Sequence, residues 1–320
     1  MGVIGAGVHG LHHVRLLSAM DGVVLTGIHD TDGEVRNRIA QDFSTTGFET
    51  LEALLDDVDC VSVAVPTSSH YRVVMECFAA GKHVLVEKPI AATVDEARTI
   101  VGEADKRGLV CAVGHIERFN SAYRSIMSGD TSPVFIESHR LSVYNPRGTD
   151  VAVVLDLMIH DIDIVLDMVR RPVTSVSAVG VPVVSDEVDI ANARLEFESG
   201  CVANLTASRI STRKMRKIRT FQRNAYLSMD FLTGETEVFR LEPGIRPAAV
   251  PGATPQLMNG ISYAKYPNDG SNALALELED FIEAVKSGSK PTVTASDGMK
   301  ALEVASRVLD GMEVSSRSMV

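Results

Sequence analysis

The sequence has few of the features that mark secreted, metal-binding or membrane-spanning chains. Only four of its 320 residues are cysteine; they lie far apart, form no C-x-x-C pair, and have no histidine close enough to complete a zinc site. We therefore expect no metal, and reduced, mostly buried thiols of the kind found in cytoplasmic proteins. No apolar run approaches the roughly 20 residues of a membrane span, and the start lacks the basic and apolar regions of a signal peptide.

Basic residues are also outnumbered. There are 31 Lys and Arg against 42 Asp and Glu, which gives a formal net charge of -11. This balance disfavours a generic binder of nucleic acid or of anionic membranes, so an anionic substrate must be met by a local basic group. The 45% hydrophobic and 23% charged fractions are those of a soluble globular protein, and 320 residues predict two domains.

The first eleven residues, MGVIGAGVHGL, carry three glycines in the G-x-G-x-x-G spacing, after a short apolar run and before an amphipathic stretch. Gly5 permits a tight turn, Gly7 lets the backbone approach a pyrophosphate, and Gly10 lets a helix pack close to a strand. Val8 and His9 open that helix, whose N-terminus offers free N–H groups and partial positive charge to phosphates. The pattern predicts a dinucleotide site.

A carboxylate follows where it can accept a hydrogen bond from a ribose 2′-hydroxyl. Asp30 ends the next apolar run, twenty residues after the last fingerprint glycine. Thr31 and Asp32 come next instead of an arginine, so we expect NAD, with NADP less favoured; Arg36 and Arg38 lie further on and leave NADP open. The first strand has room for only three or four residues, and we expect a few residues to be missing before it.

Helical and strand-like segments then alternate, as a doubly wound α/β fold requires. Continuous apolar runs at 59–65 and 83–86 predict parallel strands buried on both faces, and ligands bind at the carboxyl ends of such strands. The cofactor-binding candidates at these two ends are Pro66, Thr67, His70, Glu87 and Lys88. For His70, a structural role near a helix N-terminus weighs equally with a cofactor contact.

Lys88 has a second predicted role. Pro89 prevents the strand from continuing and holds Lys88 in an extended backbone. A lysine at the end of a parallel strand, beside a nicotinamide, can hydrogen-bond a substrate hydroxyl and favour its alkoxide-like form. The alternative is a lysine that snorkels out of the sheet. One more buried strand, at 109–113, ends at Gly114 and His115 and completes a six-stranded cofactor domain.

The fingerprint, the VAVPTSSH turn, the HVLVEKPIA segment and GHIERFN at 114–120 together resemble the Gfo/Idh/MocA family of oxidoreductases. The resemblance implies a second domain with a large, open, mostly antiparallel sheet, and substrate contacts from His115, Arg118 and Asn120. We therefore expect an NAD(P)-binding Rossmann domain at 1–119 and an α+β domain for substrate binding and oligomerisation at 120–320.

The second half carries repeated strand-like segments without intervening helices, which predicts an antiparallel sheet. These segments are 134–143, 173–184, 191–197, 201–209, 215–221, 225–231 and 235–241. The stretch 245–272 is predicted to be a long loop and a candidate lid. Helices at 273–286 and 296–309 are expected to complete this domain, and 315–320 should be poorly ordered. An exposed sheet face needs covering, so we expect a homodimer or homotetramer.

The segment LDLMIHDIDIV at 155–165 has apolar residues at helical spacing, which places Asp156, His160 and Asp163 on another face. A carboxylate beside an imidazole can fix the tautomer of the imidazole and raise its pKa, as suits a general base. From the spacing alone a solvated polar face is the default. The family resemblance implies that Asp156 and His160 act with Lys88 in catalysis, and that Asp163 supports substrate binding.

Seven basic residues gather in and just after RISTRKMRKIR at 209–219. This stretch is either a solvated strand or a receptor for an anionic substrate, in which Arg213 and Arg216 suit diphosphate oxygens. With the QRNAYLSMDF that follows, it resembles the sugar-nucleotide branch of the family.

The resemblance implies an NAD-dependent dehydrogenase that oxidises a secondary hydroxyl of a sugar, at position 3 of a UDP-linked N-acetylamino sugar. A free sugar or polyol (inositol-type) dehydrogenase is the alternative, and it would not need Arg213 and Arg216. A catalytically silent NAD-binding sensor or scaffold is a different class, which would have no need of Lys88, Asp156 and His160.

Overall fold

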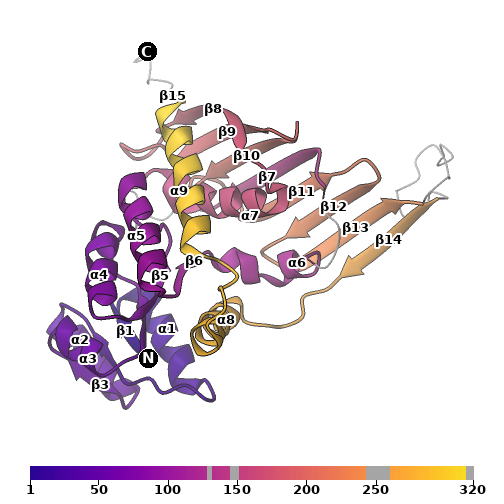
Figure 1. The fold of residues 1–320 in the computed structure, drawn as a ribbon. Helices are drawn as coiled ribbons and strands as arrows, with labels where there is room; N and C mark the ends of the chain where they lie inside the picture. Colours follow the sequence, from indigo (N-terminus) through magenta and orange to yellow (C-terminus); the bar gives the residue numbers. More distant parts are fainter. Residues whose placement is uncertain (128–131, 145–150, 243–259, 315–320) are drawn as a thin grey trace. The chain divides into compact units, whose positions relative to one another are not determined.

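A computed structural model describes residues 1–127, 132–144, 151–242 and 260–314 (Figure 1). The chain forms two compact units: Met1–Ile116 with Asn272–Leu302, and Glu117–Ser271 with Glu303–Val320. The first boundary falls close to the expected one at 119. The return of Asn272–Leu302 to the first unit corrects the expected single division of the chain.

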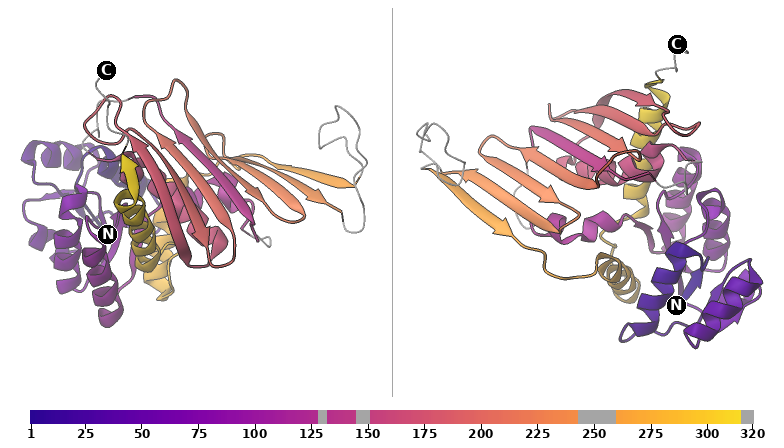
Figure 2. Two further views of the ribbon diagram at one scale, coloured as in Figure 1. Left: turned by 90° about the horizontal axis from the view of Figure 1, so that it is seen from above. Right: turned by 180° about the vertical axis from the view of Figure 1, so that it is seen from behind.

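The first unit is a six-stranded parallel sheet in the order β3-β2-β1-β4-β5-β6, with helices on both of its faces (Figures 1 and 2). Its strands are β1 Gly2–Ile4, β2 Gly27–His29, β3 Thr46–Phe48, β4 Cys60–Val63, β5 His83–Glu87 and β6 Cys111–Gly114. Its helices are α1 Val8–Ala19, α2 Gly33–Asp42, α3 Leu51–Asp56, α4 Thr67–Ala79, α5 Val94–Arg107 and α8 Ala273–Ser287. The doubly wound prediction is confirmed.

The helix ends of this unit follow from local sequence. Helix α5 begins with a capping box, in which the Thr93 hydroxyl accepts from the Glu96 backbone N–H and the Glu96 carboxylate accepts from that of Thr93. It ends at Gly108, whose φ of +64° lies in the left-handed region that favours glycine. The four cysteines, Cys60, Cys77, Cys111 and Cys201, are free thiols and buried, as expected.

Helix α8 was expected in the second domain, but it packs against α1 of the Rossmann unit. Its Leu278 and Phe281 are buried in the same core as Val14 and Leu17 of α1. The apolar period of α8 predicts a helix with one buried face, but it does not tell which of two cores that face will join.

The second unit is built on a nine-stranded sheet in the order β14-β13-β12-β11-β7-β10-β9-β8-β15. The strands are β7 Phe135–Leu141, β8 Val173–Val181, β9 Ile190–Phe197, β10 Val202–Ser208, β11 Met215–Phe221, β12 Ala225–Asp230, β13 Glu235–Leu241, β14 Ile261–Tyr266 and β15 Met312–Val314. The β7–β10 and β8–β15 pairs are parallel and the others antiparallel, which confirms the predicted mostly antiparallel sheet. Strand β14 corrects the loop expected over 245–272; the remainder of that loop up to residue 259, and 315–320, lie outside the described residues.

One face of this sheet is covered by helices. Helix α6 (Ser121–Arg124) packs on β12 and β13, while a π-helical turn (Val154–Met158) and helix α7 (Ile159–Val169) pack on β7 and β10. Helix α9 (Ala295–Asp310) begins in the first unit and ends in the second. Along β7 the side chains alternate between buried and half-buried, because successive residues of a strand point to opposite faces.

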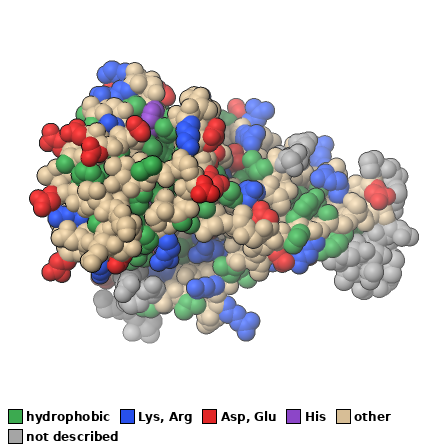
Figure 3. Space-filling view, turned by 90° about the horizontal axis from the view of Figure 1, so that it is seen from below, with side chains coloured by type: hydrophobic (Ala, Val, Ile, Leu, Met, Phe, Trp, Pro, Cys, Tyr) green, Lys and Arg blue, Asp and Glu red, His purple; other side chains and the backbone are tan. Residues whose placement is uncertain are grey.

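The opposite face carries a row of aromatic rings across five adjacent strands. The rings of Phe135, Phe221, Tyr226, Phe239 and Tyr263 follow one another with centroids 4.9 to 5.7 Å apart. Phe221 and Tyr263 are exposed. On the face of the molecule shown in Figure 3, hydrophobic side chains are interspersed with acidic and basic ones. No helix among the described residues is long and apolar enough to cross a membrane.

Candidate active site

The fingerprint loop has the geometry that its three glycines predict. Gly5 has a φ of +85°, in the left-handed region. A Cβ on Gly10 would lie 1.8 Å from the carbonyl oxygen of Gly5, so only glycine lets α1 approach the turn this closely. At Gly7 a Cβ would meet nothing within 4 Å, which leaves open space over the loop. The space that a pyrophosphate needs is therefore present at the second glycine.

The N-terminus of α1 is prepared for an anion. No side chain caps it and its first turn holds no acidic residue, so its backbone N–H groups are available. A cavity of about 510 Å³ opens at this helix end. It is lined by Ile4, Gly5, Gly7, Val8, His9, His29, Asp30, Thr31, Leu51, Ala64, Val65, Pro66, Ser69, Arg72, Val73 and Glu76. This donor set and shape fit a dinucleotide cofactor.

Asp30 lines the same cavity and is held by the backbone. Its Oδ2 accepts from Ala6 N at 2.7 Å and its Oδ1 accepts from Asp32 N at 2.9 Å. Arg36 donates from Nη1 to the main-chain carbonyl of Asp30 at 3.1 Å, not to its carboxylate. Each carboxylate oxygen has a further lone pair, so Asp30 can still accept from a ribose hydroxyl.

Six of the eleven predicted cofactor residues line the cavity, and several further lining residues were not predicted. Those it brings together are Gly5, Gly7, Val8, His9, Asp30 and Pro66, whereas Gly10, Thr67, His70, Glu87 and Lys88 are not among the lining residues. Sequence reasoning missed the face of α4 that carries Ser69, Arg72, Val73 and Glu76. Their i, i+3, i+4, i+7 spacing after Pro66 was the available signal.

His70 is 1% exposed and tied to two backbone carbonyls. Its Nδ1 lies 2.8 Å from the Pro89 oxygen and its Nε2 lies 2.9 Å from the Val65 oxygen. Burial lowers the pKa of His70, and the two carbonyl contacts oppose that shift only in part. The ring therefore fastens the turn after β4 to the turn after β5, which accounts for its burial without a cofactor contact.

Behind Lys88 lies a buried polar relay that the sequence did not reveal. Nε2 of His13 is 3.0 Å from Oε1 of Glu87, and Nδ1 of His13 is 2.8 Å from the hydroxyl of Ser62. Burial by itself would raise the pKa of Glu87, but the hydrogen bond and charge of His13, with His9 and Lys88 nearby, lower it. The other oxygen of Glu87 accepts from the Lys88 backbone N–H at 3.2 Å, so an ionised Glu87 fixes the backbone of Lys88.

The predicted acid–base pair lies on the second unit, whereas Lys88 lies on the first. Asp156 belongs to the π-helical turn and His160 to the first turn of α7, and both are half-buried. The regular helix expected over 155–165 is thus interrupted by a wider turn, a feature frequent at functional sites. Nothing in the residue pattern signalled that turn.

A buried ion-pair cluster stands beside this helix. Arg140 donates to Asp161 at 2.7 Å and to Glu117 at 2.8 Å, and all three side chains are at least 94% buried. Arg216 reaches the same Glu117 oxygen at 3.5 Å while 46% of its side chain stays exposed. Because Asp161 directly follows His160, the cluster brings Arg216 of the basic stretch to the start of α7.

Three other residues predicted to bind substrate instead make ion pairs or hydrogen bonds with other parts of the protein. Arg118 donates two hydrogen bonds to the Asp163 carboxylate, at 2.6 and 2.8 Å. Arg118 is 7% exposed and Asp163 is 1% exposed. The Asn120 side chain caps α6 and donates to Glu117 and to the Phe231 carbonyl. Structural roles therefore account for these three without a substrate. His115, 1% exposed, lies just after β6 on the first unit.

The basic stretch divides into separate parts. Arg209 is buried against the carbonyls of Val151 and Val188, and Lys217 and Arg219 pair with carboxylates on neighbouring strands. Arg213 and Lys214 are exposed just before β11. Arg223 lies beyond the other end of β11, in the turn to β12. Only Arg213, Lys214 and Arg216 thus remain together at the end of β11 near α7.

Comparison with known proteins agrees with this architecture. The sequence model described as "Oxidoreductase family, NAD-binding Rossmann fold" matches residues 1–115, and that of the "GFO/IDH/MocA C-terminal domain" matches 112–225. The chain is 34% identical to UDP-N-acetylglucosamine 3-dehydrogenase of Acidithiobacillus ferrooxidans over 98% of this chain and 96% of that protein. A crystal structure of that enzyme superposes with a TM-score of 0.90 over 97% of this chain and 96% of the other.

More distant relatives act on polyols by name. A scyllo-inositol 2-dehydrogenase (NAD(+)) of Bacillus subtilis is 27% identical over 94% of this chain and 90% of its own. A myo-inositol 2-dehydrogenase of Thermotoga maritima is 26% identical over 94% of this chain and 92% of its own. Full-length coverage by named dehydrogenases, together with the two family matches, shows that the chain is an oxidoreductase of the Gfo/Idh/MocA family with a nicotinamide-binding Rossmann domain.

Proposed function

We propose that this protein is an NAD-dependent dehydrogenase that oxidises the 3-hydroxyl of a UDP-linked N-acetylamino sugar to the ketone. The observation that carries the proposal is the 34% identity to a UDP-N-acetylglucosamine 3-dehydrogenase, which extends over nearly the whole of both chains. The presence of Lys88, Asp156 and His160 supports it, because a protein that merely holds a nucleotide needs none of these titrating groups.

In the proposed reaction, His160 accepts the proton of the substrate hydroxyl and Asp156 orients its ring. The Lys88 ammonium donates a hydrogen bond to the same oxygen and stabilises the negative charge that develops there. When bound, the nicotinamide supplies the acceptor for the hydride that leaves the carbinol carbon. The substrate thus loses one proton and one hydride, and its C–O single bond becomes a carbonyl.

The choice of NAD over NADP rests on Asp30. Its carboxylate lines the cavity, and a 2′-phosphate would meet that negative charge. Arg36 is engaged with the main chain of Asp30, and Arg72 pairs with Glu76 at 2.7 Å. Neither arginine neutralises the Asp30 carboxylate directly.

For the diphosphate of the substrate we propose Arg213 and Arg216. Arg216 joins the cluster next to α7 while keeping much of its guanidinium exposed, and Arg213 is exposed three residues earlier. A planar guanidinium can bind phosphate oxygens through two hydrogen bonds at once.

A free polyol is the second candidate substrate, because two inositol dehydrogenases align with 94% of this chain. Such an enzyme would not need Arg213 and Arg216.

The two candidate substrate classes are distinguished by measuring NADH or NADPH formation at 340 nm. The assay uses UDP-N-acetylglucosamine, N-acetylglucosamine, glucose or myo-inositol, each with NAD and with NADP. The proposal expects a signal only with the UDP-sugar and NAD, and a tenfold or greater rise in KM for Arg213→Gln/Arg216→Gln. A signal with myo-inositol and none with the UDP-sugar would overturn it. Phenylhydrazine is included to trap the ketone, so that an unfavourable equilibrium cannot mask turnover.

We further propose that the chain self-associates as a homodimer or homotetramer. The row of aromatic rings on the sheet face opposite α6 and α7 supports this, because its exposed members gain from burial against a second copy.

A further inference from the structure

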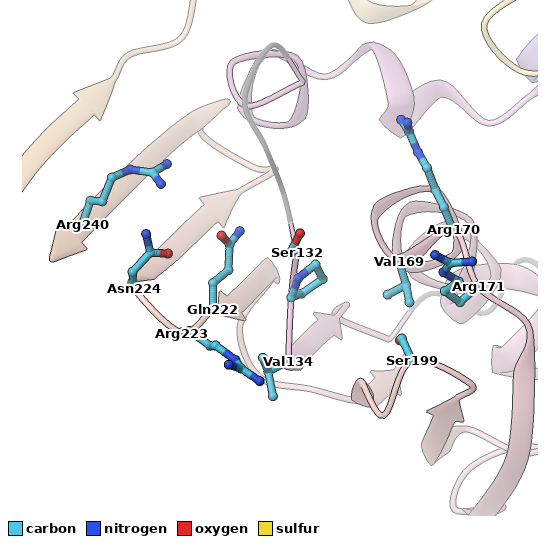
Figure 4. A pocket seen from close by; sticks show the side chains of 11 residues that line it. Ser132, Val134, Val169, Arg170, Arg171, Ser199, Gln222, Arg223, Asn224 and Arg240 are labelled. Atoms are coloured by element: carbon cyan, nitrogen blue, oxygen red, sulfur yellow. The ribbon is translucent and has the colours of Figure 1, made fainter. Parts of the chain in front are cut away.

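A hollow in the second unit lies away from the proposed catalytic groups. It measures about 860 Å³, at the end of the sheet where β7 begins and the β11–β12 turn lies. Its lining residues are Ser132, Pro133, Val134, Val169, Arg170, Arg171, Ser199, Gln222, Arg223, Asn224 and Arg240. Figure 4 shows Gln222, Asn224 and Arg240 on one side of the hollow and Arg170 and Arg171 on the other, with Ser132 between them.

The hollow is strongly basic in a chain of net charge -11. Four of its eleven lining residues are arginine and none is acidic. Arg170 is partly neutralised, because it donates to the Asp167 carbonyl and lies 3.6 Å from the Asp167 carboxylate. For Arg171, Arg223 and Arg240, no carboxylate of the described chain lies within ion-pair distance. Three cationic groups are therefore left to face the hollow.

A buried hydrogen-bond donor gives an independent indication of a ligand. Nε2 of Gln222 is buried and has no acceptor among the described residues. A buried polar atom without a partner destabilises the fold, so such atoms are rare unless something else binds them. The backbone of Gln222 is fixed, since its N–H donates to Ala225 at 2.8 Å across the turn. The Gln222 amide nitrogen is thus held at the wall of a basic hollow and has no acceptor within the part of the chain that the structure describes.

We propose that this hollow, the arginine pocket, binds a small molecule carrying a diphosphate group. Three arginines balance the roughly three negative charges of a diphosphate, and the guanidinium fork suits its oxygens. Gln222 and Asn224 provide amide donors, while Pro133, Val134 and Val169 form an apolar wall for the rest of the ligand. The volume lies within the range of ordinary small-molecule sites.

The arginine pocket is separate from the proposed substrate site on the same unit. His160 lies in the first turn of α7 and Arg170 directly follows its last residue, so about 15 Å of helix separates them. Arg216 and Arg223 are seven residues apart along β11 and its turn, or about 20 Å. A diphosphate held by Arg216 cannot also reach Arg223.

The test is calorimetric titration of the full chain, saturated with NAD so that the cofactor site is occupied, at low ionic strength with inorganic pyrophosphate and, separately, with ADP. We expect saturable binding to the wild type and at least a tenfold loss of affinity in Arg223→Gln/Arg240→Gln, with a smaller loss in Gln222→Leu. Arg194→Gln is the matched control, because Arg194 is an exposed arginine of the same sheet that pairs with Glu196. Thermal melts verify that each variant is folded.

A second control distinguishes the pocket from the proposed substrate site. Arg213→Gln/Arg216→Gln, which alters only the proposed substrate site, should keep the pyrophosphate binding that Arg223→Gln/Arg240→Gln loses. Binding of pyrophosphate alone identifies a free diphosphate as the ligand, and binding of ADP as well identifies a nucleotide. The proposal is overturned by no saturable heat at millimolar ligand, by equal binding in Arg223→Gln/Arg240→Gln, or by loss of binding in Arg213→Gln/Arg216→Gln. None of these outcomes depends on dehydrogenase activity.

Discussion

Glu277 makes the stability of the Rossmann unit depend on pH in a direction unusual for a carboxylate. It lies on α8 and is 3% exposed, and neither of its carboxylate oxygens has a hydrogen-bond partner among the described residues. Burial raises its pKa well above the ordinary 4.5, and the negative charges of Glu87 and Asp280 raise it further. The native protein therefore keeps Glu277 protonated at pH values where the unfolded chain ionises it.

The sign and size of the effect follow from proton linkage. A carboxyl whose pKa is raised on folding stabilises fully below the unfolded pKa, and this stability is lost as pH rises toward the native pKa. The loss is about 1.4 kcal/mol for each pH unit over which only the unfolded chain is ionised. Glu277→Gln keeps the shape of the side chain but cannot ionise, so it should match the wild type near pH 4.5 and be increasingly more stable above it.

Urea unfolding of both proteins between pH 4.5 and 8.5 measures this difference. The matched control is Glu279→Gln, because Glu279 is exposed on the same helix. We expect the free energy of unfolding of Glu277→Gln to rise relative to the wild type with increasing pH, and that of Glu279→Gln to run parallel to it. Parallel curves for all three proteins would show that Glu277 is ionised in the native state and would refute the reasoning.

Four further predictions concern Asp189, the fingerprint glycines Gly7 and Gly10, and the aromatic row. Asp189 is buried, and although burial would raise its pKa, hydrogen bonds from Ser185 and the backbone N–H groups of residues 183–185 lower it to about 2. Asp189→Asn should therefore lose about 2 kcal/mol in denaturant titrations at pH 7, and this deficit should shrink as the wild type is titrated from pH 4 towards 2; an unchanged deficit would contradict the assignment. Gly7→Ala should melt like the wild type but lose at least tenfold in NAD affinity by fluorescence titration, because its Cβ enters open space over the loop; unaltered NAD binding would place the pyrophosphate elsewhere. Gly10→Ala should lower the melting temperature by several degrees, since its Cβ would overlap the Gly5 carbonyl; a wild-type melt would mean that the turn relaxes freely. Phe221→Ser should reduce the mass measured by light scattering to that of a monomer, and an unchanged mass would exclude the aromatic row as the contact.

The parts of the fold that the sequence predicted best are those governed by short-range rules. The fingerprint glycines and the apolar runs of β4 and β5 depend on backbone sterics and strand burial within a few residues. Strand β14 was missed because it pairs with β13 across the segment 243–259, and its Ser, Tyr and Lys side chains lack a strict apolar alternation. Helix α8 was assigned to the wrong unit because helical periodicity does not identify the core it joins.

For the site, residue type predicted chemistry better than it predicted contacts. Arg118 and Asp163 are 45 residues apart, and no local pattern shows that they bind each other. The same holds for the relay from Ser62 through His13 to Glu87, whose members come from three elements. Such pairings depend on how strands and helices are brought together, which a single sequence does not specify.

The central claim is that the hydride leaves carbon 3 of a UDP-linked amino sugar. Incubating the enzyme with UDP-N-acetylglucosamine deuterated at carbon 3 and NAD, followed by mass spectrometry of the NADH, measures that transfer directly. The account predicts NADH heavier by one deuterium with the wild type, and at least a hundredfold less in Lys88→Met and His160→Gln, which should still bind NAD. Unlabelled NADH from the wild type, or wild-type labelling in both variants, would contradict it.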